Sequence, residues 1–188
     1  VLDLNGLLGD DGRVRREVGL VSLGDHFDWG RPEDRVVATA DGTRILAWLA
    51  AHPPDQVQII VGNHDLARVR DLSGFSNAKY AEAQARADAG LDDPKLIASF
   101  QSKYPTLASP AVISRDYSCF DEQQRALVTR LLLSRRLRLA VAPSRGMLLV
   151  HAGVTVQDLE MLRPVPQHDA ISIANALNAF LDAQVARW

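Results

Sequence analysis

The stretch LVSLGDHFDWG, residues 20–30, joins an apolar run to a cluster that contains two carboxylates and an imidazole. The apolar run is short and rich in Val and Leu, which is typical of a strand covered on both faces of a sheet. Two later runs, VQIIV at 57–61 and MLLV at 147–150, have the same character. We therefore interpret residues 18–23, 57–61 and 147–150 as buried strands.

The order of elements around the first two strands predicts a parallel pair. A helical stretch from 32 to about 51 separates them, and HPPD then ends it because Pro cannot continue a helix. A strand, a helix and a second strand in this order favour parallel strands with a right-handed crossover. Before the third strand, LRLAVAPSRGMLLV alternates, turns and resumes, which predicts a β-hairpin.

Other stretches of the chain have helical patterns. We expect helices at 68–90, 95–104 and 121–133, and Asp121 is a plausible N-cap for the last of these. Residues 1–8 and 173–188 are also interpreted as amphipathic helices, without a start signal at one end or a stop signal at the other. We therefore expect the chain to be a piece of a longer one.

Composition limits the class of protein. The 188 residues suit one domain, and 47% hydrophobic with 23% charged residues is typical of a globular protein. A net charge of −2 gives no electrostatic footprint for nucleic acid or an anionic membrane, so neither is an expected partner. The single cysteine, Cys119, excludes an internal disulfide and favours a reducing compartment, with the cytoplasm as the expected location.

Each predicted strand is followed directly by a polar cluster: GDHFD, GNHD and HAG. Because the carboxyl ends of strands in an open α/β sheet form the crevice where ligands bind, we expect the clusters to meet at one edge of one sheet. Carboxylate, amide oxygen and imidazole together suit Mn²⁺, Fe or Zn²⁺. Taken singly, the clusters resemble a turn, a helix cap and a core histidine, but all three in this order favour a site.

At these positions the sequence resembles a known family. LGDHFDWG, VGNHDLARV and LLVHAGV are similar to the G-D-x-x-D-R-G, G-N-H-D/E and H-G/A-G blocks of the calcineurin-like metallophosphoesterases, over about residues 18–155. The most similar branch holds serine/threonine phosphoprotein phosphatases and bacterial diadenosine tetraphosphatases. The resemblance implies a layered α/β fold in which helices flank central β-sheets and the metal site lies at the carboxyl ends of the strands. It implies a single domain over 1–188 with a helical cap-like insert at about 76–137.

The resemblance also implies metal ligands and an activity. Asp25 would bridge two divalent metal ions, with Mn²⁺ expected first and Fe or Zn²⁺ as alternatives, and Asn63 and His151 would bind the second ion. Two such cations can polarise a phosphoryl group and lower the pKa of a bridging water to give hydroxide. The implied enzyme is a phosphatase or phosphohydrolase acting on a phosphoprotein, a small phosphomonoester or a dinucleoside polyphosphate.

Three further residues have roles under the same resemblance. His64 would act as the general acid that protonates the leaving oxygen. Asp28 or Asp65 would hold the His64 imidazole in the required tautomer. His26 is unusual after the bridging aspartate, and we interpret it either as a group just outside the metal ligands or as a solvent-exposed loop residue.

The sequence departs from the family pattern at three places. No D-x-H precedes Asp25 and no final G-H block follows His151, and both gaps lie near the ends of the chain. Trp29 stands where the family has an arginine that clamps phosphate, so Arg31 or Arg68 is the alternative source of a guanidinium. The competing hypothesis is a non-catalytic phosphate-binding or interaction module that retains the fold with an incomplete metal site.

A basic stretch, TRLLLSRRLRL, follows the predicted insert. Its arginines could meet an anionic substrate, but we favour a solvated helix face. The four residues are Arg130, Arg135, Arg136 and Arg138.

Overall fold

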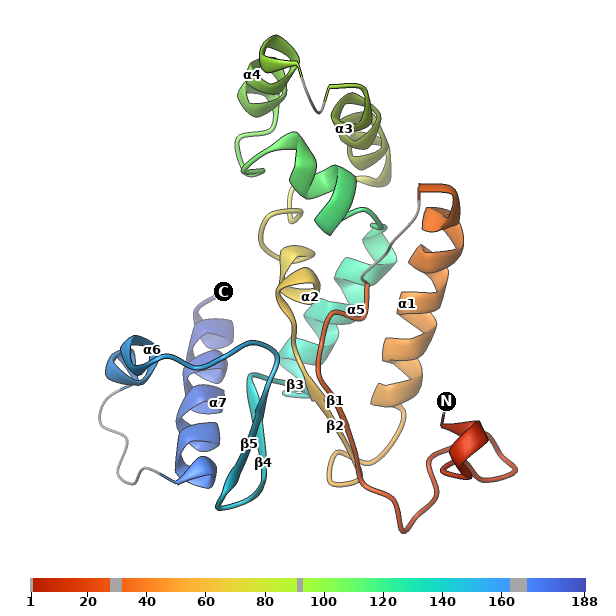
Figure 1. Ribbon diagram of the computed structural model, residues 1–188, viewed down its shortest axis with the longest axis vertical. Helices are drawn as coiled ribbons and strands as arrows, with labels where there is room; N and C mark the ends of the chain where they lie inside the picture. The colour runs from red at the N-terminus through yellow and green to blue at the C-terminus, as the bar shows by residue number, and fades with distance from the viewer. Residues whose placement is uncertain (1, 28–31, 91–92, 163–168) are drawn as a thin grey trace. The chain divides into compact units, whose positions relative to one another are not determined.

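The computed structural model describes residues 2–27, 32–90, 93–162 and 169–188 (Figure 1). These residues form two compact units. Unit 1 comprises 1–24, 47–62 and 131–188, and unit 2 comprises 25–46 and 63–130. The single domain with a cap-like insert stays a prediction, because a division into compact units does not define a domain boundary.

Unit 1 contains a three-stranded parallel sheet in the order β1, β2, β3. Its strands are β1 (Leu20–Ser22), β2 (Val57–Ile60) and β3 (Leu137–Arg138). Leu20 is in register with Val57, which confirms the predicted parallel pairing of the first two strands. Ile59 and Ile60 of β2 are fully buried, as expected for a central strand covered on both faces.

The predicted hairpin forms a second sheet in unit 1. Its strands β4 (Ala140–Ser144) and β5 (Met147–Val150) pair antiparallel, which confirms the hairpin. The expectation that β5 shares one sheet with β1 and β2 is wrong, because β3 takes the place beside β2. Asn178 explains the break between the sheets: its Oδ1 accepts from the N–H groups of Leu139 and Ala140, and its Nδ2 donates to the Ala140 carbonyl. This side chain therefore replaces a strand partner where β3 gives way to β4.

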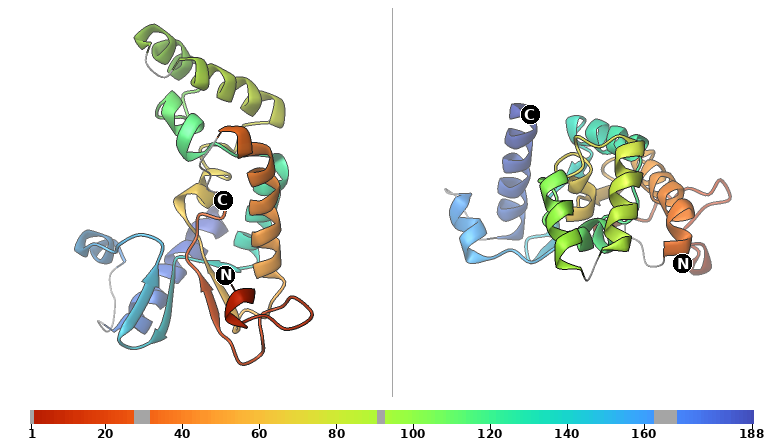
Figure 2. Two further views of the ribbon diagram at one scale, coloured as in Figure 1. Left: turned by 45° about the vertical axis from the view of Figure 1, so that its right-hand side comes forward. Right: turned by 90° about the horizontal axis from the view of Figure 1, so that it is seen from above.

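Helices at both ends of the chain belong to unit 1. The C-terminal helix α7 (Ala170–Arg187) confirms the prediction there and packs against β4 and β5 (Figure 2). The short helix α6 (Val156–Met161), which was not predicted, begins with a capping box formed by Thr155 and Asp158. At the N-terminus, the predicted helix is reduced to the 3₁₀ turn η1 (Asp3–Asn5), because Gly6 leaves it with a φ of 64°.

Helix α1 (Arg35–Ala50), preceded by the 3₁₀ turn η2 (Pro32–Asp34), confirms the helix predicted between the first two strands. After β2 come α2 (Asn63–Ala67) and α3 (Asn77–Ala89). The helix expected over 68–90 is therefore too long at its start. The Ser76 hydroxyl accepts from the Lys79 N–H and so caps α3 at a new N-terminus.

The remaining elements are α4 (Pro94–Lys103), the π-helical segment η3 (Val112–Asp116) and α5 (Glu122–Leu133). Asp121 caps α5 as predicted, because its Oδ1 accepts from the Gln124 N–H at 2.8 Å. In unit 2, α3 packs against α4 and η3 (Figure 1). The core between them is aromatic: the Tyr80 and Phe120 ring centroids are 5.0 Å apart, and those of Phe100 and Tyr104 are 4.9 Å apart. Across the described ranges, no helix combines the length and the apolar character that crossing a membrane requires.

Candidate functional site

The loop after β1 has an unusual backbone. Gly24 has a φ of 97° and Asp25 a φ of 55°, so two successive residues adopt positive φ values. The left-handed region costs a residue with a Cβ about 1 kcal/mol or more, although Asp tolerates it better than most. Such a conformation persists only where surrounding contacts hold it. The strained position coincides with the aspartate that the sequence singled out as a metal ligand.

Hydrogen bonds of unit 2 hold this loop, and we call them the carboxylate clasp, formed by Asp25, His26, His64 and Asp65. The Asp65 carboxylate accepts from the backbone N–H groups of Asp25 at 3.1 Å and His26 at 3.0 Å. In return, Asp25 Oδ1 accepts from the His64 N–H at 3.0 Å. The clasp therefore joins the GDH and NHD motifs, which lie about forty residues apart.

The imidazole of His26 completes the clasp. Its Nδ1 lies 3.0 Å from Asp65 Oδ2, and the side chains of His26 and Asp65 are 3% and 0% exposed. Because the carboxylate only accepts, Nδ1 carries the hydrogen of this bond. The interpretation of His26 as a solvent-exposed loop residue is therefore wrong. The role of Asp65 toward His64 stays a prediction.

Arg68 lies in the core of unit 2 and is fully buried. Its Nη1 donates to the His64 carbonyl at 2.6 Å, Nη2 donates to the carbonyls of Phe27 and Cys119, and Nε donates to Gln124 Oε1 at 3.3 Å. Burial lowers the pKa of the guanidinium. The prediction that Arg68 binds a substrate phosphate is wrong, because its donors are directed at protein acceptors and none faces solvent.

Cys119 lies beside Arg68 and is 1% exposed. Its carbonyl accepts from Arg68, and its Sγ donates to the Arg35 carbonyl at 3.5 Å. Burial raises the pKa of the Cys119 thiol. The thiol is therefore a packed, neutral group of the core.

In unit 1, His151 follows β5 and is held by the end of β1. Its Nδ1 donates to the Leu23 carbonyl at 2.7 Å, so Nε2 is the ring nitrogen that this bond leaves for a metal ion. A metal-binding histidine commonly donates its other N–H to a carbonyl in this way. Gly24 permits the approach, because a Cβ there would lie 2.6 Å from the Gly62 nitrogen and 2.8 Å from His151 Nδ1. The sequence could not show that this glycine is required by contact as well as by its φ.

The other predicted residues are placed as follows. Asn63 begins α2 and is exposed, and His64 is half-buried with its ring edge-on to Tyr117, at a centroid distance of 5.4 Å. Asp28, Trp29 and Arg31 lie outside the described residues.

The donor types suit a divalent cation of hard to borderline character. The predicted donors are the Asp25 carboxylate, the Asn63 carboxamide and the His151 imidazole. Among the described residues, no group of three or more His, Cys, Asp or Glu side chains is arranged to hold a metal ion. The two-metal assignment therefore rests on donor chemistry and on the motifs.

Comparison with known proteins adds no relative: no family model, no curated protein and no solved structure matches this chain. The resemblance to the metallophosphoesterases therefore stands on the three motifs alone.

Proposed function

We propose that the protein is a dinuclear metal-dependent phosphoesterase that hydrolyses a phosphate ester or phosphoanhydride. The observation that carries the proposal is the carboxylate clasp. Asp25 and His64 come from two separate motifs, and the carboxylate of one accepts from the backbone N–H of the other at 3.0 Å. Two unrelated turns, about forty residues apart in the chain, would have no reason to be joined in this way.

Asp25, Asn63 and His151 are the proposed metal ligands. Divalent cations, when bound, would supply Lewis acidity toward the phosphoryl oxygens. Asp65 acts on Asp25 through the backbone. Its carboxylate accepts a hydrogen bond from the Asp25 N–H and so holds the left-handed turn. His151 is oriented by its bond to the Leu23 carbonyl, which directs Nε2 away from that carbonyl.

His64 is the proposed proton donor to the leaving oxygen. Its backbone N–H donates to Asp25 and so fixes the main chain at this residue, while its ring lies edge-on to Tyr117. Asp28 and Asp65 are the carboxylates proposed to select its tautomer.

The decisive experiment measures Mn²⁺-dependent hydrolysis of p-nitrophenyl phosphate. We expect Asp25→Asn to reduce kcat/KM about a thousandfold or more, because an amide is a poor bridge between cations. The replacement keeps an oxygen that can accept the His64 N–H, so the fold should persist. Asp55→Asn, at an exposed residue in the turn before β2, is the matched control and should leave the rate unchanged.

A second variant tests the proton donor. His64→Ala should reduce kcat about a hundredfold or more, with KM nearly unchanged, because the lost interaction forms only in the transition state. Wild-type activity in Asp25→Asn would refute the two-metal assignment. Binding of phosphate without turnover by the wild-type protein would favour the non-catalytic module. Comparing turnover of a phosphopeptide with that of a diadenosine polyphosphate would identify the substrate class.

A further inference from the structure

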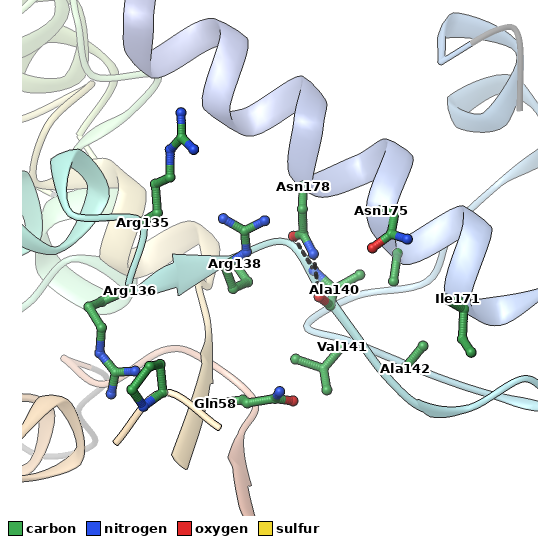
Figure 3. Close-up of a pocket in the computed structure, with 12 residues that line it drawn as sticks. Gln58, Arg135, Arg136, Arg138, Ala140, Val141, Ala142, Ile171, Asn175 and Asn178 are labelled. Atoms are coloured by element: carbon green, nitrogen blue, oxygen red, sulfur yellow. Dashed lines mark hydrogen bonds between the residues drawn. The ribbon is translucent and has the colours of Figure 1, made fainter. Parts of the chain in front are cut away.

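Unit 1 contains a cavity of about 370 Å³ that the proposed function does not use (Figure 3). It lies between the strands β2 and β4, the segment 135–138 and the helix α7. This volume is within the range of small-molecule sites. The lining residues used below are Gln58, Arg135, Arg136, Arg138, Val141, Ile171 and Asn175.

The basic stretch singled out in the sequence forms one end of this cavity. Helix α5 ends at Leu133, so Arg135, Arg136 and Arg138 do not lie on a solvated helix face, contrary to the interpretation that we favoured. Only Arg130 of the four lies on α5, where it is exposed. The segment that follows α5 therefore brings three arginines to the wall of the cavity.

The positive charge at this end is only partly balanced. Asp182 of α7 is the carboxylate that pairs with these arginines in the described part of the chain, at 3.3 Å from Arg138 Nη1 and 3.7 Å from Arg135 Nε. One carboxylate therefore pairs with two guanidinium groups, while Arg136 donates to backbone carbonyls instead. Arg135 has a φ of 57° and a side chain that is 71% exposed, so its guanidinium is accessible.

Donors around the cavity are also left over. Arg136 Nη2 donates to the carbonyls of Leu49 and His52, but its Nε is buried and has no partner among the described residues. The carboxamides of Gln58 and Asn175 have no hydrogen bond within the described ranges either. Gln58 is half-buried and Asn175 is exposed, so their carboxamides can donate to an acceptor oxygen of a ligand, whereas the enclosed Arg136 Nε cannot be reached from the cavity.

The opposite end of the cavity carries the apolar side chains of Ile171 and Ala142, with the Asn175 carboxamide beside them (Figure 3). Figure 3 shows the three arginines on one side, Gln58 and Val141 near the middle, and Ile171 with Ala142 at the far side. The guanidinium groups of Arg135 and Arg138 point the same way, and that of Arg136 points the other way. The cavity therefore suits a molecule with an anionic end and a small uncharged body.

We propose that this cavity binds a small organic phosphomonoester, with its phosphate on Arg135 and Arg138 and its body toward Val141 and Ile171. A guanidinium fork can donate two parallel hydrogen bonds to phosphate oxygens. Arg135 and Arg138 together with Asp182 carry a net positive charge, so an anionic group at these two guanidiniums is favourable. The site is separate in sequence from the carboxylate clasp and does not depend on a metal ion.

The test is isothermal titration calorimetry with phenylphosphonate, which cannot be hydrolysed, in buffer containing EDTA. We expect saturable one-to-one binding, weaker binding of benzoate and of inorganic phosphate, and none of benzyl alcohol. Arg135→Gln and Arg138→Gln should each raise Kd about tenfold, because each removes a charge-assisted hydrogen bond. Arg130→Gln, an exposed arginine on α5, is the matched control and should leave Kd unchanged.

A second variant tests the apolar end. Ile171 is 39% exposed, so the Ile171→Asp variant should fold normally. It should weaken the binding of phenylphosphonate more than the binding of inorganic phosphate. The absence of saturable binding by the folded wild-type protein would overturn the proposal, as would equal effects of Arg130→Gln and Arg135→Gln. Weaker binding in Asp25→Asn under EDTA would also overturn it, because the ligand would then lie at the clasp. Failure of the phosphatase assay has no bearing on these outcomes.

Discussion

Arg68 in unit 2 and Arg136 in unit 1 both donate to backbone carbonyls, yet they differ in how fully their donors are used. Each side-chain nitrogen of Arg68 has a protein acceptor, and the residue is fully buried. Arg136 is half-buried, and its Nε has no partner in the described part of the chain. A guanidinium whose nitrogens all have acceptors holds the protein together, whereas a buried donor without an acceptor reduces what Arg136 contributes to stability.

The strongest test of this comparison is Arg68→Ala. The change leaves the carbonyls of Phe27, His64 and Cys119 without their donor and opens a cavity in the core. We expect the free energy of unfolding to fall by about 4 kcal/mol, measured by urea denaturation. Arg68→Lys should lose a large part of this stability too, since one ammonium cannot serve the same acceptors.

The control for Arg68 is Arg44→Ala, at an arginine of α1 whose side chain is 78% exposed. This variant should change the free energy of unfolding by less than about 0.5 kcal/mol. Equal losses of unfolding free energy in Arg68→Ala and Arg44→Ala would show that a buried guanidinium with protein acceptors contributes no more to stability than an exposed one.

Asp65→Ala tests the main hydrogen-bond acceptor of the carboxylate clasp in unit 2. The variant leaves the N–H groups of Asp25 and His26 and the ring N–H of His26 without their acceptor. We expect the free energy of unfolding, measured by urea denaturation, to fall by about 3 kcal/mol. Asp55→Ala, at an exposed aspartate, should show almost no loss. A stable Asp65→Ala variant would mean that the clasp does not hold the left-handed turn.

Arg136→Ala tests the other arginine of the comparison with Arg68. The variant removes hydrogen bonds to the Leu49, His52 and Val57 carbonyls, but water can reach this half-buried position and replace part of them. We expect the free energy of unfolding, measured by thermal or urea denaturation, to fall by about 1 to 2 kcal/mol. A loss as large as that of Arg68→Ala would show that Arg136 serves the fold alone.

A third arginine, Arg35, has a carboxylate partner and so gives a pH-dependent effect. Arg35 and Ser114 hold the pKa of Asp88 below its ordinary 3.8. Because the folded pKa is depressed, the stabilisation is present above the ordinary pKa and is lost as the pH falls through the depressed value. The difference in unfolding free energy between wild type and Asp88→Asn should be under about 1 kcal/mol and should shrink below pH 3.8. A difference that persists in acid would show that the ion pair is not its cause.

Local patterns predicted the elements of the fold well. The parallel pairing of β1 and β2, the helix between them and the β4–β5 hairpin follow from short apolar runs, proline and turn residues. The start of α3 was missed, although Ser76 and the preceding Gly74 carry ordinary signals for a new helix.

Contacts made by single distant side chains could not be predicted. Asn178 separates the two sheets from about forty residues away, and nothing in the 137–150 pattern indicates it. The pairing of His26 with Asp65 and the burial of Arg68 depend on tertiary packing in the same way. Periodicity indicates which face of an element is buried, but it does not identify the partner of one polar group.

The buried thiol of Cys119 has a practical consequence. Cys119 is the only cysteine of the chain, and its carbonyl accepts from Arg68, so a thiol reagent can label the protein only when the core of unit 2 opens. The labelling rate therefore measures the free energy of that local opening in the native state, without any engineered probe. In a protein with two compact units, this one atom reports on unit 2 separately, while bulk unfolding signals average over both.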